Sequence, residues 1–154
     1  MKRVKGDLIQ LALDGEFDLI VHGCNCFCTM GAGIARQIQD RFPQALAADK
    51  ATPSGDRSKL GNYSMARVSH TQGEFIIING YTQYHYNGPG VLLDYQALDT
   101  LFQRLKSDFP GHRMGYPKIG AGLAGGDFHR IAAIIDRALT GENHTLVEYF
   151  SLQK

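Results

Sequence analysis

The sequence predicts an α/β fold of three layers, a sandwich in which helices cover both faces of a mixed, mostly parallel central sheet. Residues 17–21 form an apolar run with β-branched members, and residues 74–79 contain a second such run. Strands that are buried on both faces have this continuous apolar character. Segments with helical periodicity alternate with these strands, for example Ile34, Ile38 and Phe42 at intervals of four residues.

The composition fits a single domain over residues 1–154. Hydrophobic residues make up 44% of the chain and charged residues 20%, an ordinary globular composition. The formal charge of +1 argues against a protein that binds the phosphate backbone of nucleic acid, so no nucleic-acid partner is expected. No apolar run reaches membrane-spanning length, and the first ten residues lack the apolar core of a signal peptide. We therefore expect a cytoplasmic monomer with no membrane partner.

The first half of the chain contains the central strand and the helix that follows it. Asp7 is suited to cap the apolar segment after it, and Pro43 is suited to the first turn of a helix. In order, the expected elements are a strand at 2–5, a short apolar segment at 8–13, a turn at 14–16, the central strand at 17–21, a helix from 33 to about 42 and a short helix from 43 onward.

The second half of the chain continues the alternation. Residues 52–61 are the longest polar stretch and predict a surface loop, and residues 81–90 predict a loop rich in tyrosine and glycine. The expected elements are strands at 63–68 and 74–79, a helix over about 91–106, a strand at 113–117, a helix from Asp127 to near Gly141 and a last strand at 145–150.

The three cysteines lie close together, at Cys24, Cys26 and Cys28. An odd number at this spacing does not form a disulfide framework, and no second Cys or His pair completes a zinc site. We interpret them as small residues in a half-buried turn of a reduced protein. No metal and no cofactor are expected.

Two glycine-rich turns each connect a strand to a helix. Gly31-Ala32-Gly33 follows the strand at 17–21, and residues 118–126 follow the strand at 113–117. The first amides of a helix lack internal partners and carry a partial positive charge, so each turn is suited to bind an anion. Side by side, the two turns predict a pyrophosphate site. Neither turn has the Walker or the dinucleotide-binding pattern.

Four motifs resemble those of macrodomains, the α/β/α modules that bind ADP-ribose. They are GDL at 6–8, VHGCNC at 21–26, MGAGIA at 30–35 and PKIGAGLAGGDF at 117–128, and together they span most of the chain. The second and third resemble the branch that contains ADP-ribose 1″-phosphate phosphatases and terminal ADP-ribose glycohydrolases, including bacteriophage members. This resemblance implies ADP-ribose or ADP-ribose 1″-phosphate as the ligand.

The resemblance also implies which residues bind the ligand. Asp7 would accept a hydrogen bond from the adenine amino group beside the Leu8 amide, and Asn25 would lie near the distal ribose. Tyr149, or its neighbour Phe150, would pack against the adenine; packing in the core is the alternative. The two phosphate loops would be Gly31, Ala32, Gly33 and Ile34 in the first turn, and Ile119, Gly120, Ala121, Gly122, Leu123, Ala124 and Gly125 in the second.

The sequence departs from the glycohydrolases of this branch at two positions. Their lysine after the strand at 75–79 is replaced here by Asn79-Gly80-Tyr81, and their aspartate after the second glycine turn is replaced by Ala124. A covalent mechanism through lysine loses both parts. Ala124 also stands where related hydrolases have an aromatic residue over the distal ribose, which predicts room for a 1″-phosphate.

These features together predict a phosphatase that converts ADP-ribose 1″-phosphate to ADP-ribose and phosphate. His22 would supply a proton or a positive charge, Asn25 would orient the ribose or water, and Asp127 would orient water. Each residue also has a structural alternative. His22 would be a strand-end histidine hydrogen-bonded to the backbone, Asn25 would hydrogen-bond the backbone groups of its own loop, and Asp127 would cap a helix. Hydrolysis of ADP-ribose from a modified macromolecule and non-enzymatic binding of ADP-ribose are the alternative functions.

Overall fold

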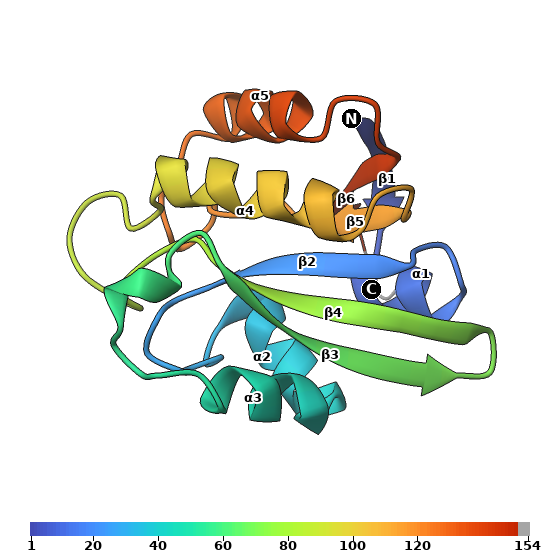
Figure 1. Cartoon of the computed structure of the whole chain (residues 1–154), viewed down its shortest axis with the longest axis horizontal. Helices are drawn as coiled ribbons and strands as arrows, with labels where there is room; N and C mark the ends of the chain where they lie inside the picture. The colour runs from blue at the N-terminus through green and yellow to red at the C-terminus, as the bar shows by residue number, and fades with distance from the viewer. Residues whose placement is uncertain (151–154) are drawn as a thin grey trace.

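A six-stranded sheet forms the centre of the computed structural model, which describes residues 1–150 (Figure 1). Its strand order is β1-β6-β5-β2-β4-β3, and every neighbouring pair is parallel except β3 and β4. The strands are β1 (Lys2–Gly6), β2 (Leu19–Cys24), β3 (Tyr63–His70), β4 (Gly73–Tyr81), β5 (Met114–Tyr116) and β6 (His144–Tyr149). The mixed, mostly parallel sheet confirms the predicted fold class.

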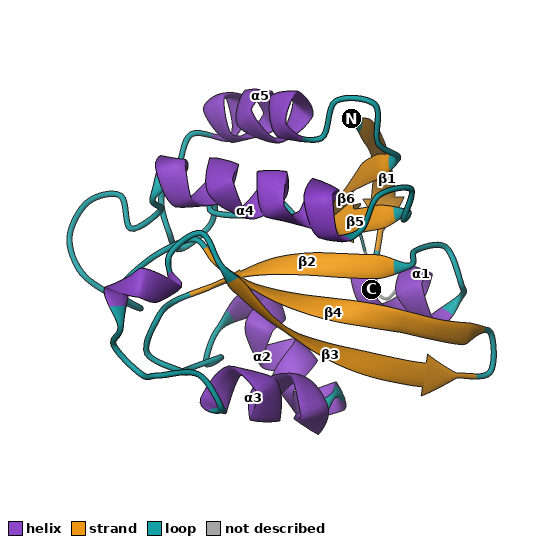
Figure 2. Ribbon diagram, in the orientation of Figure 1, coloured by secondary structure: helices purple, strands orange, loops and turns teal. Residues whose placement is uncertain are grey.

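Helices cover both faces of this sheet (Figure 2). The helices α4 and α5 lie on one face and α1, α2 and α3 lie on the other. The helical segments are α1 (Leu8–Leu13), α2 (Gly33–Arg41), α3 (Pro43–Lys50), the 3₁₀ turn η1 (Arg57–Lys59), α4 (Tyr95–Asp108) and α5 (Phe128–Ala138). No helix of residues 1–150 is long and apolar enough to cross a membrane.

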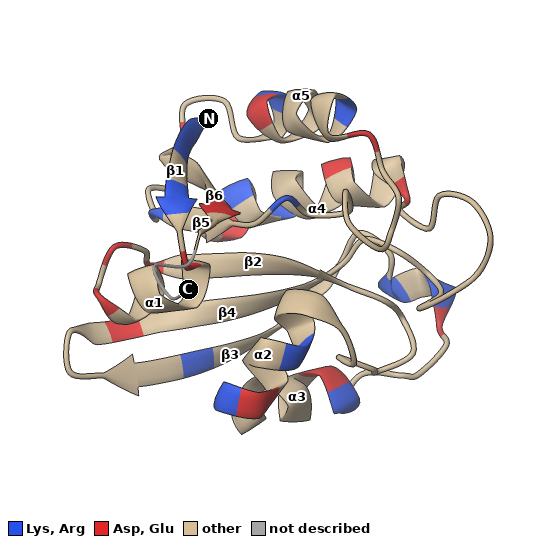
Figure 3. Cartoon of the chain, turned by 180° about the vertical axis from the view of Figure 1, so that it is seen from behind, with Lys and Arg blue, Asp and Glu red and all other residues tan. Residues whose placement is uncertain are grey.

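The central strands are buried on both faces because their side chains enter two separate cores. Ile76 and Ile78 of β4 pack in the core beneath α4 and α5, whereas Phe75 and Ile77 pack beneath the helices of the other face. Alternate residues of a strand point to opposite faces, so a continuous apolar run fills both cores. The edge strand β1 instead carries Lys2, Arg3 and Lys5 (Figure 3).

The central strand and helix α4 have boundaries that differ clearly from the sequence-based expectation. The central strand runs from Leu19 to Cys24, later than expected, because its ladder with β4 continues to the pair Cys24 and Tyr81. Helix α4 begins at Tyr95 rather than near residue 91, because the Asp94 side chain accepts a hydrogen bond from the Ala97 amide at 2.9 Å and caps the helix there.

The polar stretch at 52–61 is more structured than a surface loop. It contains η1, and its Lys59 side chain is only 6% exposed. The Lys59 ammonium donates to the Cys26 carbonyl at 3.0 Å and lies 4.6 Å from the centre of the Tyr81 ring. These contacts tie the stretch to the turn after β2 and explain its burial.

Candidate functional site

A cleft of about 540 Å³ opens at the carboxyl ends of β1, β5 and β6, beside the N-terminus of α2. Ligands of open α/β sheets bind at this edge, because the loops that leave the parallel strands gather there. The residues that line the cleft are Gly6, Asp7, Leu8, Gly33, Ile34, Gln37, Pro117, Lys118, Ala121, Gly122, Val147, Glu148 and Tyr149.

The N-terminus of α2 reaches this cleft without a capping side chain. Its cap position is Ala32, which makes no side-chain hydrogen bond, whereas aspartates cap α1, α4 and α5. Gly33 has a φ of 57°, a left-handed conformation that glycine adopts without strain, and a Cβ there would meet no atom within 4 Å. The first amides of α2 are therefore free of side-chain partners at the wall of the cleft, where they favour an anion.

The second glycine turn lines the same cleft through Ala121 and Gly122. It closes on itself through hydrogen bonds from the Gly126 amide to the Gly120 carbonyl at 2.7 Å and from the Gly125 amide to the Gly122 carbonyl at 3.0 Å. Within residues 1–150, the amides of Gly122 and Leu123 donate to no protein acceptor. The turn therefore holds a fixed shape and leaves amide groups available to a ligand.

Ala124 supports this turn from behind and does not face the cleft. Its carbonyl accepts hydrogen bonds from the Leu92 and Leu93 amides at 2.8 and 3.3 Å, and its side chain packs in the core beneath α4 and α5. The Ala124 side chain packs in the core and does not line the cleft, so the room expected over a distal ribose stays a prediction. Ile119 is likewise buried in that core.

The opposite end of the cleft combines a carboxylate with an exposed aromatic ring. Asp7 lines the cleft, and one of its carboxylate oxygens accepts the Gln10 amide at 3.1 Å as the cap of α1. Leu8 follows at the same wall. Tyr149 also lines the cleft and is 72% exposed, so packing in the core, the alternative for this residue, is wrong.

His22 of β2 is not among the residues that line the cleft. Its side chain is 1% exposed, and its Nε2 lies 2.7 Å from the Asn79 side-chain oxygen. Burial lowers the pKa of His22 to about 4, although the Asn79 hydrogen bond opposes the shift. His22 is therefore neutral near pH 7, and the expectation that it supplies a positive charge there is wrong.

Asn79 lies within β4, in the segment 79–81 where the resemblance implies a lysine in the glycohydrolases. It is fully buried, and its amide nitrogen donates to the Ala45 carbonyl at 3.0 Å and to the Ser64 hydroxyl at 3.1 Å. All of its polar atoms are therefore used in joining β4 to α3, β3 and His22. This side chain holds the sheet and its helix together and does not reach the cleft.

Asn25 and Asp127 both make local hydrogen bonds, as expected of a loop asparagine and of a helix cap. The Asn25 oxygen accepts the Phe27 amide at 2.8 Å, and its nitrogen donates to the carbonyl and hydroxyl oxygens of Thr29 at 3.0 and 2.8 Å. Asp127 caps α5 by accepting the His129 amide at 3.0 Å. Neither residue lines the cleft.

Of the other predicted loop residues, Gly31, Ala32, Gly120, Leu123 and Gly125 belong to the turns that frame the cleft but do not line it. Sequence reasoning missed Gln37, Pro117, Lys118, Val147 and Glu148, which do. Pro117 and Lys118 lie in the motif at 117–128, and Gln37 lies one helical turn after Gly33. Val147 and Glu148 directly precede the predicted Tyr149 in the same strand.

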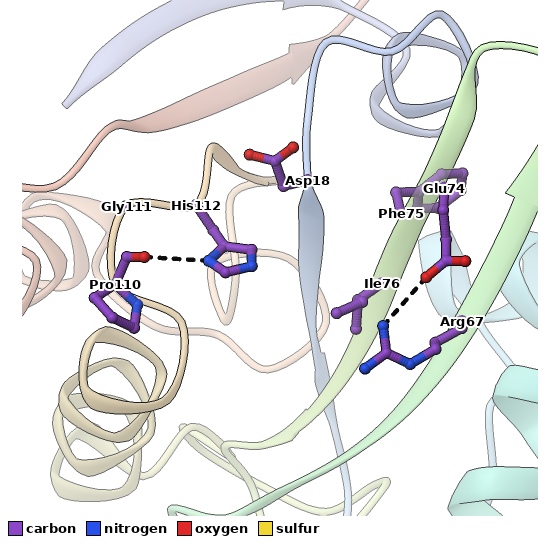
Figure 4. Close-up of a pocket in the computed structure, with 8 residues that line it drawn as sticks. All are labelled: Asp18, Arg67, Glu74, Phe75, Ile76, Pro110, Gly111 and His112. Carbon is purple, nitrogen blue, oxygen red and sulfur yellow. Dashed lines mark hydrogen bonds and ion pairs between the residues drawn. The ribbon is translucent and has the colours of Figure 1, made fainter.

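A second depression lies at the opposite, amino-terminal edge of the strands (Figure 4). It measures about 390 Å³, and its charged side chains are already paired. Arg67 contacts Glu74 at 3.2 Å, and Asp18 contacts Arg113 at 2.9 Å. We therefore place the candidate site at the carboxyl edge.

The described residues contain no group of three His, Cys, Asp or Glu side chains placed to hold a metal ion. Cys24 and Cys26 are buried free thiols, and Cys28 is half-buried. Burial raises the pKa of the Cys24 and Cys26 thiols, so both stay protonated at neutral pH. The cleft itself, with its two walls of backbone amides, is thus the feature that carries the chemistry.

Comparison with known proteins supports a family assignment, although no protein-family model matches the chain. An uncharacterised 17.5 kDa protein of Enterobacteria phage T4 is 37% identical over 142 residues, which cover 88% of both chains. A DNA ADP-ribosyl glycohydrolase of Mycobacterium tuberculosis is 27% identical over 129 residues. That match covers 82% of this chain and 35% of the mycobacterial protein, so the chain spans about a third of its length.

Solved structures share the fold. The macrodomain of Mycobacterium tuberculosis DarG superposes with a TM-score of 0.76 at 20% identity, covering 97% of both chains. Thermosipho africanus DarTG, solved in complex with ADP-ribose, superposes with a TM-score of 0.73 at 15% identity, covering all of this chain and 43% of that one. The chain therefore has the macrodomain fold, and it belongs to the same family as the uncharacterised phage T4 protein.

Proposed function

We propose that the cleft binds ADP-ribose, with the adenine between Asp7 and Tyr149 and the diphosphate between the two glycine turns. An exposed tyrosine ring offers a face for a nucleobase, and a carboxylate accepts hydrogen bonds from an exocyclic amino group. The macrodomain fold and the ADP-ribose complex of DarTG support this ligand. The cleft volume of about 540 Å³ is within the range of small-molecule sites.

One observation carries the proposal: α2 begins without a capping side chain at the same cleft that the second glycine turn faces. Ala32 leaves the first amides of α2 without a side-chain partner, and the amide of Gly122, which lines the cleft, has no protein acceptor within residues 1–150. Two walls of unpaired amides suit two linked phosphates, because each phosphate can accept hydrogen bonds from one wall.

The reaction that we propose is hydrolysis of ADP-ribose 1″-phosphate to ADP-ribose and inorganic phosphate. Water attacks the phosphorus, the bond to the ribose oxygen breaks, and the ribose oxygen takes a proton. Backbone amides aimed at the phosphoryl oxygens stabilise the charge of the transition state without moving. None of the three predicted catalytic residues, His22, Asn25 and Asp127, lines the cleft. We therefore assign these three to positioning the strand end, the first loop and the second turn.

A second candidate function is removal of ADP-ribose from a modified macromolecule. The 27% identity to a DNA ADP-ribosyl glycohydrolase favours it. The buried Asn79, in the region of the lysine of related glycohydrolases, argues against a covalent lysine intermediate, so this reaction would need direct attack by water. Hydrolysis of the phosphate needs no nucleophilic side chain, because backbone amides can stabilise the charge on the phosphoryl oxygens, and it is our first candidate.

A single experiment tests both candidates. The protein is incubated separately with ADP-ribose 1″-phosphate, an ADP-ribosylated DNA oligonucleotide and an ADP-ribosylated protein. Free phosphate and free ADP-ribose are then measured, with Gly122→Val as the matched inactive control. Phosphate release from the first substrate alone supports the phosphatase, and ADP-ribose release from either macromolecule supports the second candidate. Calorimetric binding of ADP-ribose without turnover would identify a non-enzymatic binding module.

A further inference from the structure

The cleft contains one cationic side chain to which the proposed contacts with the adenine and with the glycine turns assign no role. Among the described residues that line it, Lys118 is the single cation, and Asp7 and Glu148 are the two acids. One positive and two negative groups give the lining a formal charge of −1. Without Lys118 this charge would be −2, so Lys118 reduces the repulsion that a diphosphate meets in the cleft.

The position of Lys118 is fixed by its surroundings. It follows Pro117 at the end of β5, and its carbonyl accepts the Ala121 amide at 3.3 Å, which begins the second glycine turn. Its ammonium lies 5.4 Å from the centre of the Phe128 ring, at the start of α5. The aromatic face holds the side chain beside the turn while leaving its three donor hydrogens available.

Lys118 is also free to pair with a ligand. In the part of the chain that the structure describes, it forms no ion pair with any carboxylate. Arg3 lies 5.8 Å from the centre of the same Phe128 ring but does not line the cleft. An unpaired ammonium at a turn with unpaired amides is suited to a phosphate oxygen.

We propose that Lys118 is a ligand-binding residue whose ammonium pairs with the diphosphate of the ligand. The pairing makes the cleft select adenosine derivatives with two or more negative charges over neutral adenosine. Asp7 and Glu148 repel phosphate and Lys118 restores attraction at the second glycine turn, so the selection depends on charge and not on the fit of the base. This inference rests on the proposed binding of ADP-ribose in the same cleft.

The test measures two ligands against two substitutions of one residue. Lys118→Met should raise the dissociation constant of ADP-ribose about 5- to 20-fold and flatten its dependence on salt, since a partly exposed charge pair is lost. Lys118→Arg should keep the constant within about twofold of the wild-type value, since the charge is retained. Adenosine, titrated by NMR, should bind the wild type and Lys118→Met equally. Lys2→Met is the matched control, because Lys2 is an exposed lysine that lines a different depression.

The outcomes separate this inference from the function on which it rests. If the wild type binds ADP-ribose and Lys118→Met binds it equally well with the same salt dependence, the Lys118 role is wrong and the cleft assignment stands. An equal loss of affinity for adenosine and ADP-ribose would also overturn it, because that result identifies a purely structural lysine. Failure of the wild type to bind ADP-ribose would overturn both.

Discussion

Acidification should destabilise this protein through His22. The side chain is 1% exposed and its Nε2 bonds Asn79, whose amide nitrogen is committed to Ala45 and Ser64. The Asn79 oxygen is thus the acceptor, and His22 is neutral with its proton on Nε2. Protonation of Nδ1 would place an uncompensated charge in a buried site, which is why the pKa is lowered to about 4.

The size of the effect follows from the difference between two pKa values. Histidine in an unfolded chain titrates near 6.5, and His22 in the folded chain titrates near 4. Between these values the unfolded chain binds a proton that the folded chain does not, so the free energy of unfolding falls as the pH falls. A shift of about 2.5 units corresponds to a loss of about 3 kcal/mol, complete near pH 4.

Urea denaturation at several pH values between 7 and 4 measures this loss, with His22→Gln as the comparison. Glutamine keeps an amide donor for the Asn79 oxygen and does not titrate. His144 and Asp49 also have pKa values shifted by burial, His144 downward and Asp49 upward, so the wild-type curve contains their contributions as well. The difference between wild type and variant isolates His22, because both proteins share the other groups.

The reasoning fails if the two proteins lose stability in parallel as the pH falls. An NMR titration that gives His22 a pKa above 6 would refute it independently. Such a value would also return His22 to the list of groups able to supply a proton near neutral pH.

Three substitutions test the cleft and its frame. Asp7→Ala should lower the free energy of unfolding by about 1 kcal/mol through loss of the α1 cap, and should weaken ADP-ribose binding by about 1–3 kcal/mol in calorimetry. Unchanged affinity would remove Asp7 from the site. Asp7→Asn, which can still cap α1, separates the effect on stability from the effect on binding. Gly122→Val should fold normally, because a Cβ there meets no atom within 4 Å. It should bind ADP-ribose at least about tenfold more weakly, because the branched side chain blocks the approach of phosphate to the backbone. Normal binding by the folded variant would contradict phosphate binding by the second glycine turn. Asn25→Ala should lower the melting temperature and reduce the free energy of unfolding by about 1–3 kcal/mol, because the Phe27 amide and the Thr29 oxygens lose their partners. Turnover per folded molecule should be preserved. A large loss of turnover at an unchanged melting temperature would instead indicate a direct role for Asn25 in the reaction.

Local sequence patterns are enough to locate the elements of this fold and its two glycine-rich turns. The apolar run at 75–78 predicts a doubly buried strand, and the structure divides it between two cores. Asp7 and Asp127 cap α1 and α5 as their positions before helical segments predict. These features depend on neighbours a few residues away, so local propensity and periodicity reveal them.

The tertiary structure alone decided which predicted residues reach the cleft. His22 and Asn25 belong to a motif that resembles a catalytic one, but His22 pairs with Asn79, 57 residues later, and Asn25 is consumed by its own loop. Ala124 faces the core, and Lys118 from the same turn faces the cleft. A side chain's direction and its pKa depend on strand pairing and burial between distant segments. No local pattern encodes these contacts, which form only when the sheet and its helices pack together.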